Sequence, residues 1–76
     1  MMTEQEMMWN FARSIAGWRE KLDMNADNFA ELIGVSRSTL YNYESGRCMP
    51  QLYTAVLIAK KLGTSLDDLV RRHPYA

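Results

Sequence analysis

The sequence predicts an all-α fold of five helices in one compact domain, residues 1–76. Apolar residues recur at spacings of three and four positions, which places them on one face of a helix. No stretch alternates between apolar and polar residues with the period of two that marks a half-buried strand. Short turn signals divide the chain into five helix-like stretches. A chain of 76 residues is near the lower size limit for one hydrophobic core, which excludes a second domain.

The first helix is predicted over about residues 4–22. Thr3, followed three residues later by Glu6, fits a capping box at its start. The apolar residues that follow have spacings of three and four and form the predicted inward face: Met8, Phe11, Ile15, Trp18 and Leu22.

The second and third helices follow with almost no chain between them. Asn25 is a good N-cap for the second helix, and Gly34 ends it in the way a C′ glycine does. Ser36 caps the third helix only two residues later. Because so short a turn prevents an antiparallel arrangement, the two helices must cross at a steep angle. Leu40 and Tyr43 are predicted to face the core.

The fourth helix is predicted to begin with Pro50 in its first turn and to end at Gly63. Its predicted inward residues are Leu52, Ala55, Ile58, Ala59 and Leu62. Ser65 with Asp68 caps a short fifth helix, which Pro74 ends. Leu66, Leu69 and Val70 are its apolar residues.

The third helix carries a polar outward stripe made of Arg37, Ser38, Tyr41 and Asn42. An arginine can donate two hydrogen bonds to guanine, an asparagine can pair with adenine, and a serine bonds several base edges. This stripe is therefore suited to a DNA major groove. The alternative is an ordinary solvated helix face, which also carries polar residues.

Glu44 lies four residues after Leu40 and therefore returns to the inward face of the third helix. An unpaired carboxylate is costly to bury, so Glu44 needs a cation there. Arg19 on the first helix is the best placed candidate. The alternative is a glutamate on the surface.

Composition excludes several classes of protein. Cys48 is the single cysteine and His73 the single histidine, so neither a disulfide nor a zinc site is expected. There is no nucleophile with a base, no glycine-rich phosphate loop and no other metal-ligand set, so we expect no catalytic residues, no cofactor and no enzyme. No apolar run approaches the roughly 20 residues of a membrane span, and the N-terminus lacks a secretory signal. The predicted compartment is the cytoplasm.

Charge is neutral overall but unevenly distributed. The chain has nine basic and nine acidic residues. Residues 1–31 hold three basic and six acidic side chains, whereas residues 32–63 hold four basic and one acidic. A molecule polarised in this way can present a basic face to phosphate.

Residues 13–70 resemble the DNA-binding domain of the phage-repressor and Cro-type helix-turn-helix family, the XRE family. The resemblance rests on the pattern F29-A30-x-x-I33-G34-V35-S36-R37-S38-T39-L40-x-x-Y43-E44-x-G46, then Pro50, then I58-A59-x-x-L62-G63-T64-S65. It implies a lambda-repressor-like fold with the helix-turn-helix proper at about 25–45 and an N-terminal helical extension at about 3–12. In this family the helix that begins at Ser36 reads the major groove, and the glutamate at the position of Glu44 commonly pairs with an arginine of the first helix.

Carried over position by position, the resemblance implies two sets of DNA contacts. The base readers are Arg37, Ser38, Asn42 and Tyr41. The phosphate contacts are Ser36, Asn25, Ala26, Asn28, Ser45 and Arg47. Many members of the family have a glutamine where this chain has Ala26. The low overall basicity predicts few phosphate contacts and a shallow salt dependence.

Two apolar groups lie outside this pattern. The first is Met1, Met2, Met7, Met8 and Trp9, which we interpret either as extra core packing or as a contact surface for a second subunit or a protein partner. The second is Tyr53, Val56 and Leu57 on the fourth helix. Cys48 beside Arg47 is an incidental cysteine or a redox switch.

The sequence therefore predicts a sequence-specific regulator of transcription that binds double-stranded DNA. The expected form is a repressor that binds a palindromic operator as a homodimer, because one recognition helix reads too few base pairs to be selective. The alternative is an antitoxin-like module that binds a protein partner and uses DNA binding for autoregulation. A third interpretation is a domain that keeps the fold without binding DNA.

Overall fold

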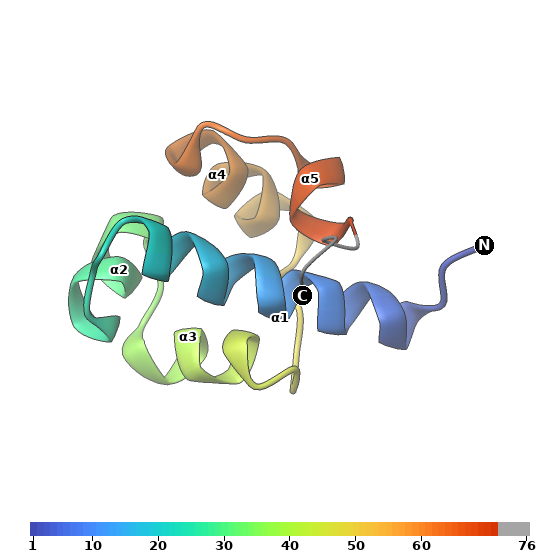
Figure 1. The fold of residues 1–76 in the computed structure, drawn as a ribbon, viewed down its shortest axis with the longest axis horizontal. Helices are drawn as coiled ribbons and strands as arrows, with labels where there is room; N and C mark the ends of the chain where they lie inside the picture. Colours follow the sequence, from blue (N-terminus) through green and yellow to red (C-terminus); the bar gives the residue numbers. More distant parts are fainter. Residues whose placement is uncertain (72–76) are drawn as a thin grey trace.

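A computed structural model describes residues 1–71, and these form five α-helices and no strand, which confirms the predicted all-α class. The helices are α1 (Glu4–Lys21), α2 (Ala26–Ile33), α3 (Arg37–Glu44), α4 (Leu52–Leu62) and α5 (Leu66–Val70). Figure 1 shows α1 running through the middle of the molecule, with α3 on one side and α4 and α5 on the other. The predictions for His73 and Pro74 lie outside the described residues.

The core lies where the helices converge on α1. Phe11 and Ile15 of α1 are fully buried and belong to one core cluster with apolar residues of the other four helices. Phe11 contacts the ring of Tyr43 edge to face, with 5.4 Å between the centroids. Burial raises the pKa of the Tyr43 phenol above its ordinary value. The buried core residues of α2 to α5 are Phe29, Ala30, Ile33, Leu40, Tyr43, Ile58, Ala59, Leu62 and Leu69.

Local signals placed most helix ends correctly. Thr3 and Glu6 form the reciprocal capping box, and the side chain of Asn25, Ser36 or Ser65 accepts a hydrogen bond from the backbone N–H three residues later. Gly34 and Gly63 adopt the left-handed conformation that ends a helix. These predictions are confirmed. The sequence could make them because each cap depends only on residues within one turn of each other.

Three predictions near helix ends are wrong. Pro50 does not lie in the first turn of α4, because Gln51 is the N-cap and the helix begins at Leu52. The spacing predicts that Leu52 faces inward, but it is 73% exposed, because it opens α4 and the buried residues of this helix begin only at Ile58. Leu22 is also exposed because α1 ends at Lys21 and Leu22 is its C-cap.

A buried amide joins the two ends of the described chain. The Asn10 side chain donates a hydrogen bond of 3.1 Å to the carbonyl oxygen of Val70, sixty positions away. The same amide lies 3.5 Å from the sulfur of Met2. Because Asn10 is 9% exposed, this bond satisfies a polar group that burial would otherwise penalise. It fixes α5 against the first half of α1.

An ion pair fastens α3 to α1. Arg19 donates two hydrogen bonds to the Glu44 carboxylate, from Nε at 2.8 Å and from a terminal nitrogen at 2.9 Å. The side chains are 30% and 19% exposed, so the pair is only partly shielded from water. The hydrogen bond to Glu44 raises the pKa of Arg19 above its ordinary value. This bidentate geometry is the stronger kind of ion pair.

We expect Glu44→Ala to lower the free energy of unfolding by about 1 to 3 kcal/mol, because it leaves a partly buried guanidinium without its charged acceptor. Urea titration of both proteins measures the difference. Glu31→Ala is the matched control, since Glu31 is exposed on α2, and its effect should stay within about 0.5 kcal/mol. Equal stability of the two variants would show that solvent screens the Arg19–Glu44 pair to insignificance.

Candidate nucleic-acid interface

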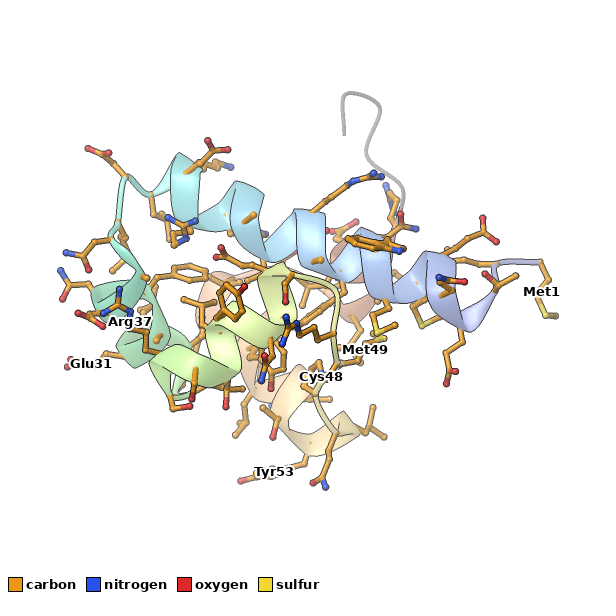
Figure 2. All side chains as sticks on the ribbon, turned by 90° about the horizontal axis from the view of Figure 1, so that it is seen from below. Met1, Glu31, Arg37, Cys48, Met49 and Tyr53 are labelled. Atoms are coloured by element: carbon orange, nitrogen blue, oxygen red, sulfur yellow. The ribbon has the colours of Figure 1, made fainter. Side chains whose placement is uncertain are left out.

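The outward stripe of α3 is presented by a helix whose opposite face is locked in the core. Leu40 and Tyr43 are buried, which fixes the rotation of α3 about its axis. Arg37 and Ser38 are then exposed, Tyr41 is 61% exposed, and Asn42 is half-buried. Figure 2 looks onto this side, with Arg37 labelled near the start of α3 and Cys48 in the segment after its end. The structure thus brings all four predicted base readers to one helix.

The start of α3 is held by a hydroxyl cluster. Ser36 Oγ accepts a hydrogen bond of 3.1 Å from the Thr39 backbone N–H and donates one of 2.8 Å to Thr39 Oγ1. Ser38 Oγ lies 3.3 Å from Ser36 Oγ. Because Ser36 already serves as the N-cap, its hydroxyl fixes the first turn of the helix rather than pointing freely outward.

The start of α2 offers backbone donors beside this cluster. Asn25 Oδ1 accepts a hydrogen bond of 2.8 Å from the Asn28 backbone N–H. The N–H groups of Ala26 and Asp27 lie in the first turn, where the helix itself supplies no acceptor and the helix dipole favours an anion. The Ala26 side chain packs against the core cluster, and the Asn28 side chain is exposed.

Arg37 has a partner that the sequence interpretation missed. Its Nε lies 3.6 Å from Oδ1 of Asp27, which joins the first turns of α2 and α3. Both side chains are about two-thirds or more exposed, at 73% and 68%, so water screens the pair and it stabilises little. Asp27 therefore directs the Arg37 side chain, but the pair is too weak to keep Arg37 from other partners. The ten-residue separation gave no sign of this contact, because it arises only from the angle between the two helices.

The far end of the stripe holds a second cation. The Arg47 guanidinium lies 5.7 Å from the centroid of the Tyr41 ring, within the range of a cation–π contact. Ser45 Oγ donates a hydrogen bond of 3.3 Å to the Asn42 carbonyl oxygen, which makes it part of the helix end. Arg47 and Tyr41 are both exposed, so Arg47 lies over an exposed member of the stripe.

The two apolar groups outside the stripe are partly exposed. Met1, Met2 and Trp9 are exposed, whereas Met7 and Met8 are half-buried. An open hollow at this end is lined by Met1, Met2, Glu6, Trp9, Asn10 and Arg13. On α4, Leu52, Tyr53 and Leu57 are exposed, and Val56 is half-buried. Cys48 is exposed as well.

Two other features are absent from residues 1–71. Within this range no group of three or more His, Cys, Asp or Glu side chains is arranged to hold a metal ion. In the same residues, no helix has both the length and the apolar character needed to cross a membrane. The stripe of α3 and the turn after it expose the hydroxyl of Ser38 and the cationic side chains of Arg37 and Arg47.

Comparisons with known proteins point in the same direction. A family model described as helix-turn-helix, HTH_3, matches residues 15–69. The cryptic phage CTXphi transcriptional repressor RstR of Vibrio cholerae is 35% identical over 60 residues, which cover 79% of this chain and 54% of that protein. The chain thus spans about half the length of this curated relative.

Two solved structures share the fold. The crystal structure of an HTH_3 family transcriptional regulator from Vibrio cholerae has a TM-score of 0.76 and 27% identity, over 88% of this chain and 38% of that one. That of a hypothetical transcription factor, NHTF, from Neisseria has a TM-score of 0.79 and 20% identity, over 99% of this chain and 85% of that one. At 20% identity, the likeness to the Neisseria structure is one of fold alone.

Proposed function

Because this chain belongs to the HTH_3 family of helix-turn-helix proteins, we propose that it is a sequence-specific, double-stranded DNA-binding regulator of transcription. The observation that carries the proposal is the stripe of base-reading side chains on α3, exposed on a helix whose other face is fixed in the core. Repression is the simplest outcome, since a protein that occupies promoter DNA blocks its use. A repressor is also what the RstR relative is described as. We expect it to act in the cytoplasm, where it meets DNA.

Base reading is assigned to Arg37, Ser38, Asn42 and Tyr41. Arg37 near the start of α3 can donate two hydrogen bonds to guanine O6 and N7. Its weak contact with Asp27 is exposed and exchangeable, so Arg37 can leave it for a base. Tyr41 can place its ring edge against a thymine methyl group or donate its hydroxyl to the DNA backbone. The half-buried Asn42 can pair with adenine N6 and N7.

Phosphate binding is assigned to both ends of the stripe. At one end the first turn of α2 provides the N–H groups of Ala26 and Asp27 together with the exposed Asn28 side chain, next to the Asn25 and Ser36 caps. At the other end, Ser45 and Arg47 follow α3. Asp27 places a negative charge near the first group, which is unfavourable for a phosphate and agrees with the small number of contacts expected from a neutral chain.

A homodimer on a palindromic operator completes the proposal. One recognition helix reads too few base pairs to be selective, whereas two related by a two-fold axis read half-sites about 34 Å apart. The exposed face of α4, with Leu52, Tyr53 and Leu57, and the N-terminal Met and Trp surface are the two candidate contacts.

A second candidate function is an antitoxin-like role, in which a protein partner binds the N-terminal surface and DNA binding serves autoregulation. The open hollow with exposed Met1, Met2 and Trp9 favours it, because methionine and tryptophan are common in adaptable interfaces.

Selection of bound duplexes from a random DNA pool tests the proposal. We expect an enriched palindrome that binds at least about 1,000-fold more tightly than scrambled DNA. The absence of any enrichment, with no binding at low salt, would overturn the assignment to DNA and favour the protein-partner role.

Arg37→Ala is expected to cost about 1 to 3 kcal/mol on the selected site and to relax one base position, through loss of the bidentate contact with guanine. Titration against single-base variants of the site measures both effects. Arg37→Lys is the control, because it keeps the charge but not the planar fork, and it should relax the same position. Equal weakening on every sequence would instead make Arg37 a phosphate contact.

Arg47→Ala is expected to weaken binding equally on all duplexes and to flatten the salt dependence by about one unit, since one phosphate contact is lost. Arg71→Ala is the matched control. Arg71 follows α5, on the opposite side of α1 from α3 (Figure 1), so its loss should leave the slope unchanged. Identical slopes for the two variants would remove Arg47 from the phosphate contacts.

Deletion of residues 1–8 distinguishes the roles of the N-terminal surface. If that surface binds a different protein, the shortened chain keeps its DNA affinity and its dimer mass but loses the partner. If it forms the dimer, sedimentation should show a monomer and DNA affinity should fall, because two half-sites are no longer read together. Retention of dimer mass would direct attention to the exposed face of α4.

A further inference from the structure

Trp9 lies against the turn that follows the recognition helix. A Cβ atom placed on Gly46 would lie 2.9, 3.1 and 3.2 Å from Cζ3, Cε3 and Cη2 of the Trp9 ring. Three atoms of one ring at these distances mean that the indole rests on the glycine, and a side chain at position 46 would force the ring to shift. Trp9 is 45% exposed, so the rest of the indole faces solvent and the N-terminal hollow.

The turn under the indole carries the predicted phosphate contacts. Gly46 adopts φ of +73°, which favours glycine. The Gly46 N–H donates to the Tyr43 carbonyl oxygen at 3.2 Å, and the Arg47 N–H donates to the Asn42 carbonyl oxygen at 3.0 Å, the pair of bonds of a Schellman turn. Ser45 and Arg47 flank Gly46, so the direction in which Arg47 leaves the helix depends on this turn.

The same turn occurs at the end of α4 without a covering ring. Gly63 has φ of +70°, and the Thr64 N–H donates to the Ala59 carbonyl oxygen at 2.9 Å. A Cβ on Gly63 would meet nothing within 4 Å. The hydrogen-bonded turn therefore forms without an indole, and the ring on Gly46 is an addition at the helix end that carries Ser45 and Arg47.

Trp9 also lies outside residues 15–69, the part of the chain that matches the family model. The contact therefore ties the N-terminal part of α1 to the end of α3, two segments 37 positions apart in sequence. The charged side chains and hydrogen-bond donors of the candidate interface lie within residues 15–69. Trp9, which packs on the Gly46 turn of that interface, lies outside this range.

We propose that Trp9 is a positioning residue for DNA binding, whose indole fixes the turn at Gly46 and thereby holds Arg47 against a phosphate. The inference rests on the proposed function. It assigns Trp9 no contact with DNA of its own. Loss of the ring frees the turn, so that Arg47 must be ordered at the moment of binding, and that ordering costs affinity.

The experiment compares Trp9→Ala, Arg47→Ala and the double variant on the selected duplex over a range of salt concentrations. If Trp9 acts through Arg47, Trp9→Ala weakens binding by no more than Arg47→Ala does and flattens the salt dependence by up to about 0.9 unit. The double variant then binds as weakly as Arg47→Ala alone, because the two changes remove the same contact. Trp9→Phe keeps an aromatic ring on the glycine and should restore most of the affinity.

Trp18→Phe is the matched control, since Trp18 is the other tryptophan of α1 and packs against the core with Lys21 over its ring. It should leave the salt dependence unchanged even where it lowers the melting temperature. Additive losses in the double variant, or a folded Trp9→Ala protein with wild-type affinity and slope, would overturn the proposal.

A measurement without DNA separates this proposal from the function on which it rests. Trp9→Ala should speed hydrogen exchange of the Arg47 amide and leave the equivalent Thr64 amide at the end of α4 unchanged. Gly46→Ala should also lower the melting temperature more than Gly63→Ala does, and the excess should vanish in the Trp9→Ala background.

If these results hold but the chain binds no duplex, the proposed function fails and the support of the turn stands. If the chain binds DNA but the Arg47 amide exchanges at the same rate with and without Trp9, the positioning role fails alone.

Discussion

The ion pair between Arg19 and Glu44, together with the contact between Phe11 and the adjacent Tyr43, determines how α3 is held against α1. Tyr43 and Glu44 lie on the side of α3 that faces α1. Anchoring them fixes both the rotation of α3 and its distance from the long helix. The outward stripe therefore needs no stabilising contacts of its own, and its side chains are left available. Figure 1 shows α1 in the middle of the molecule, where it packs against α3 on one side and α5 on the other.

Electrostatics at the candidate interface are local rather than global. The chain as a whole is neutral, so long-range attraction to DNA is weak. Arg37 and Arg47 lie at opposite ends of the stripe. Asp27 partly neutralises the charge of Arg37, and the guanidinium of Arg47 lies over the ring of Tyr41. A surface of this kind gains more from the fit of individual hydrogen bonds than from charge neutralisation. Such a balance favours discrimination between sequences over tight binding to any duplex.

The sequence predicted what depends on near neighbours. It also predicted one contact between helices, the Arg19–Glu44 pair, because Glu44 falls on the inward face of α3 and needs a cation there. It missed the other contacts that depend on the angles between helices. The caps at Thr3, Asn25, Ser36 and Ser65 follow from one turn of chain, and each lies where it was expected. The start of α4 could not be placed in this way, because the extended segment before it is set by how α4 docks on α2 and α5, and Pro50 fits that segment equally well. The contacts of Arg37 with Asp27 and of Trp9 with Gly46 join separate elements, and no local sequence pattern predicts them. The base and phosphate assignments remain predictions.

The hydrogen bond from Asn10 to Val70 bears on the order in which the chain folds. This hydrogen bond closes a loop of nearly the whole described chain. The chain must lose the conformational entropy of closing that loop before the hydrogen bond can stabilise it. The capped turn between α2 and α3 has no such cost, so we expect it to form early and the seam between α1 and α5 to close last. Interactions that form after the rate-limiting step act mainly on the rate of unfolding. Asn10 would then determine how long the native state persists rather than how quickly it is reached.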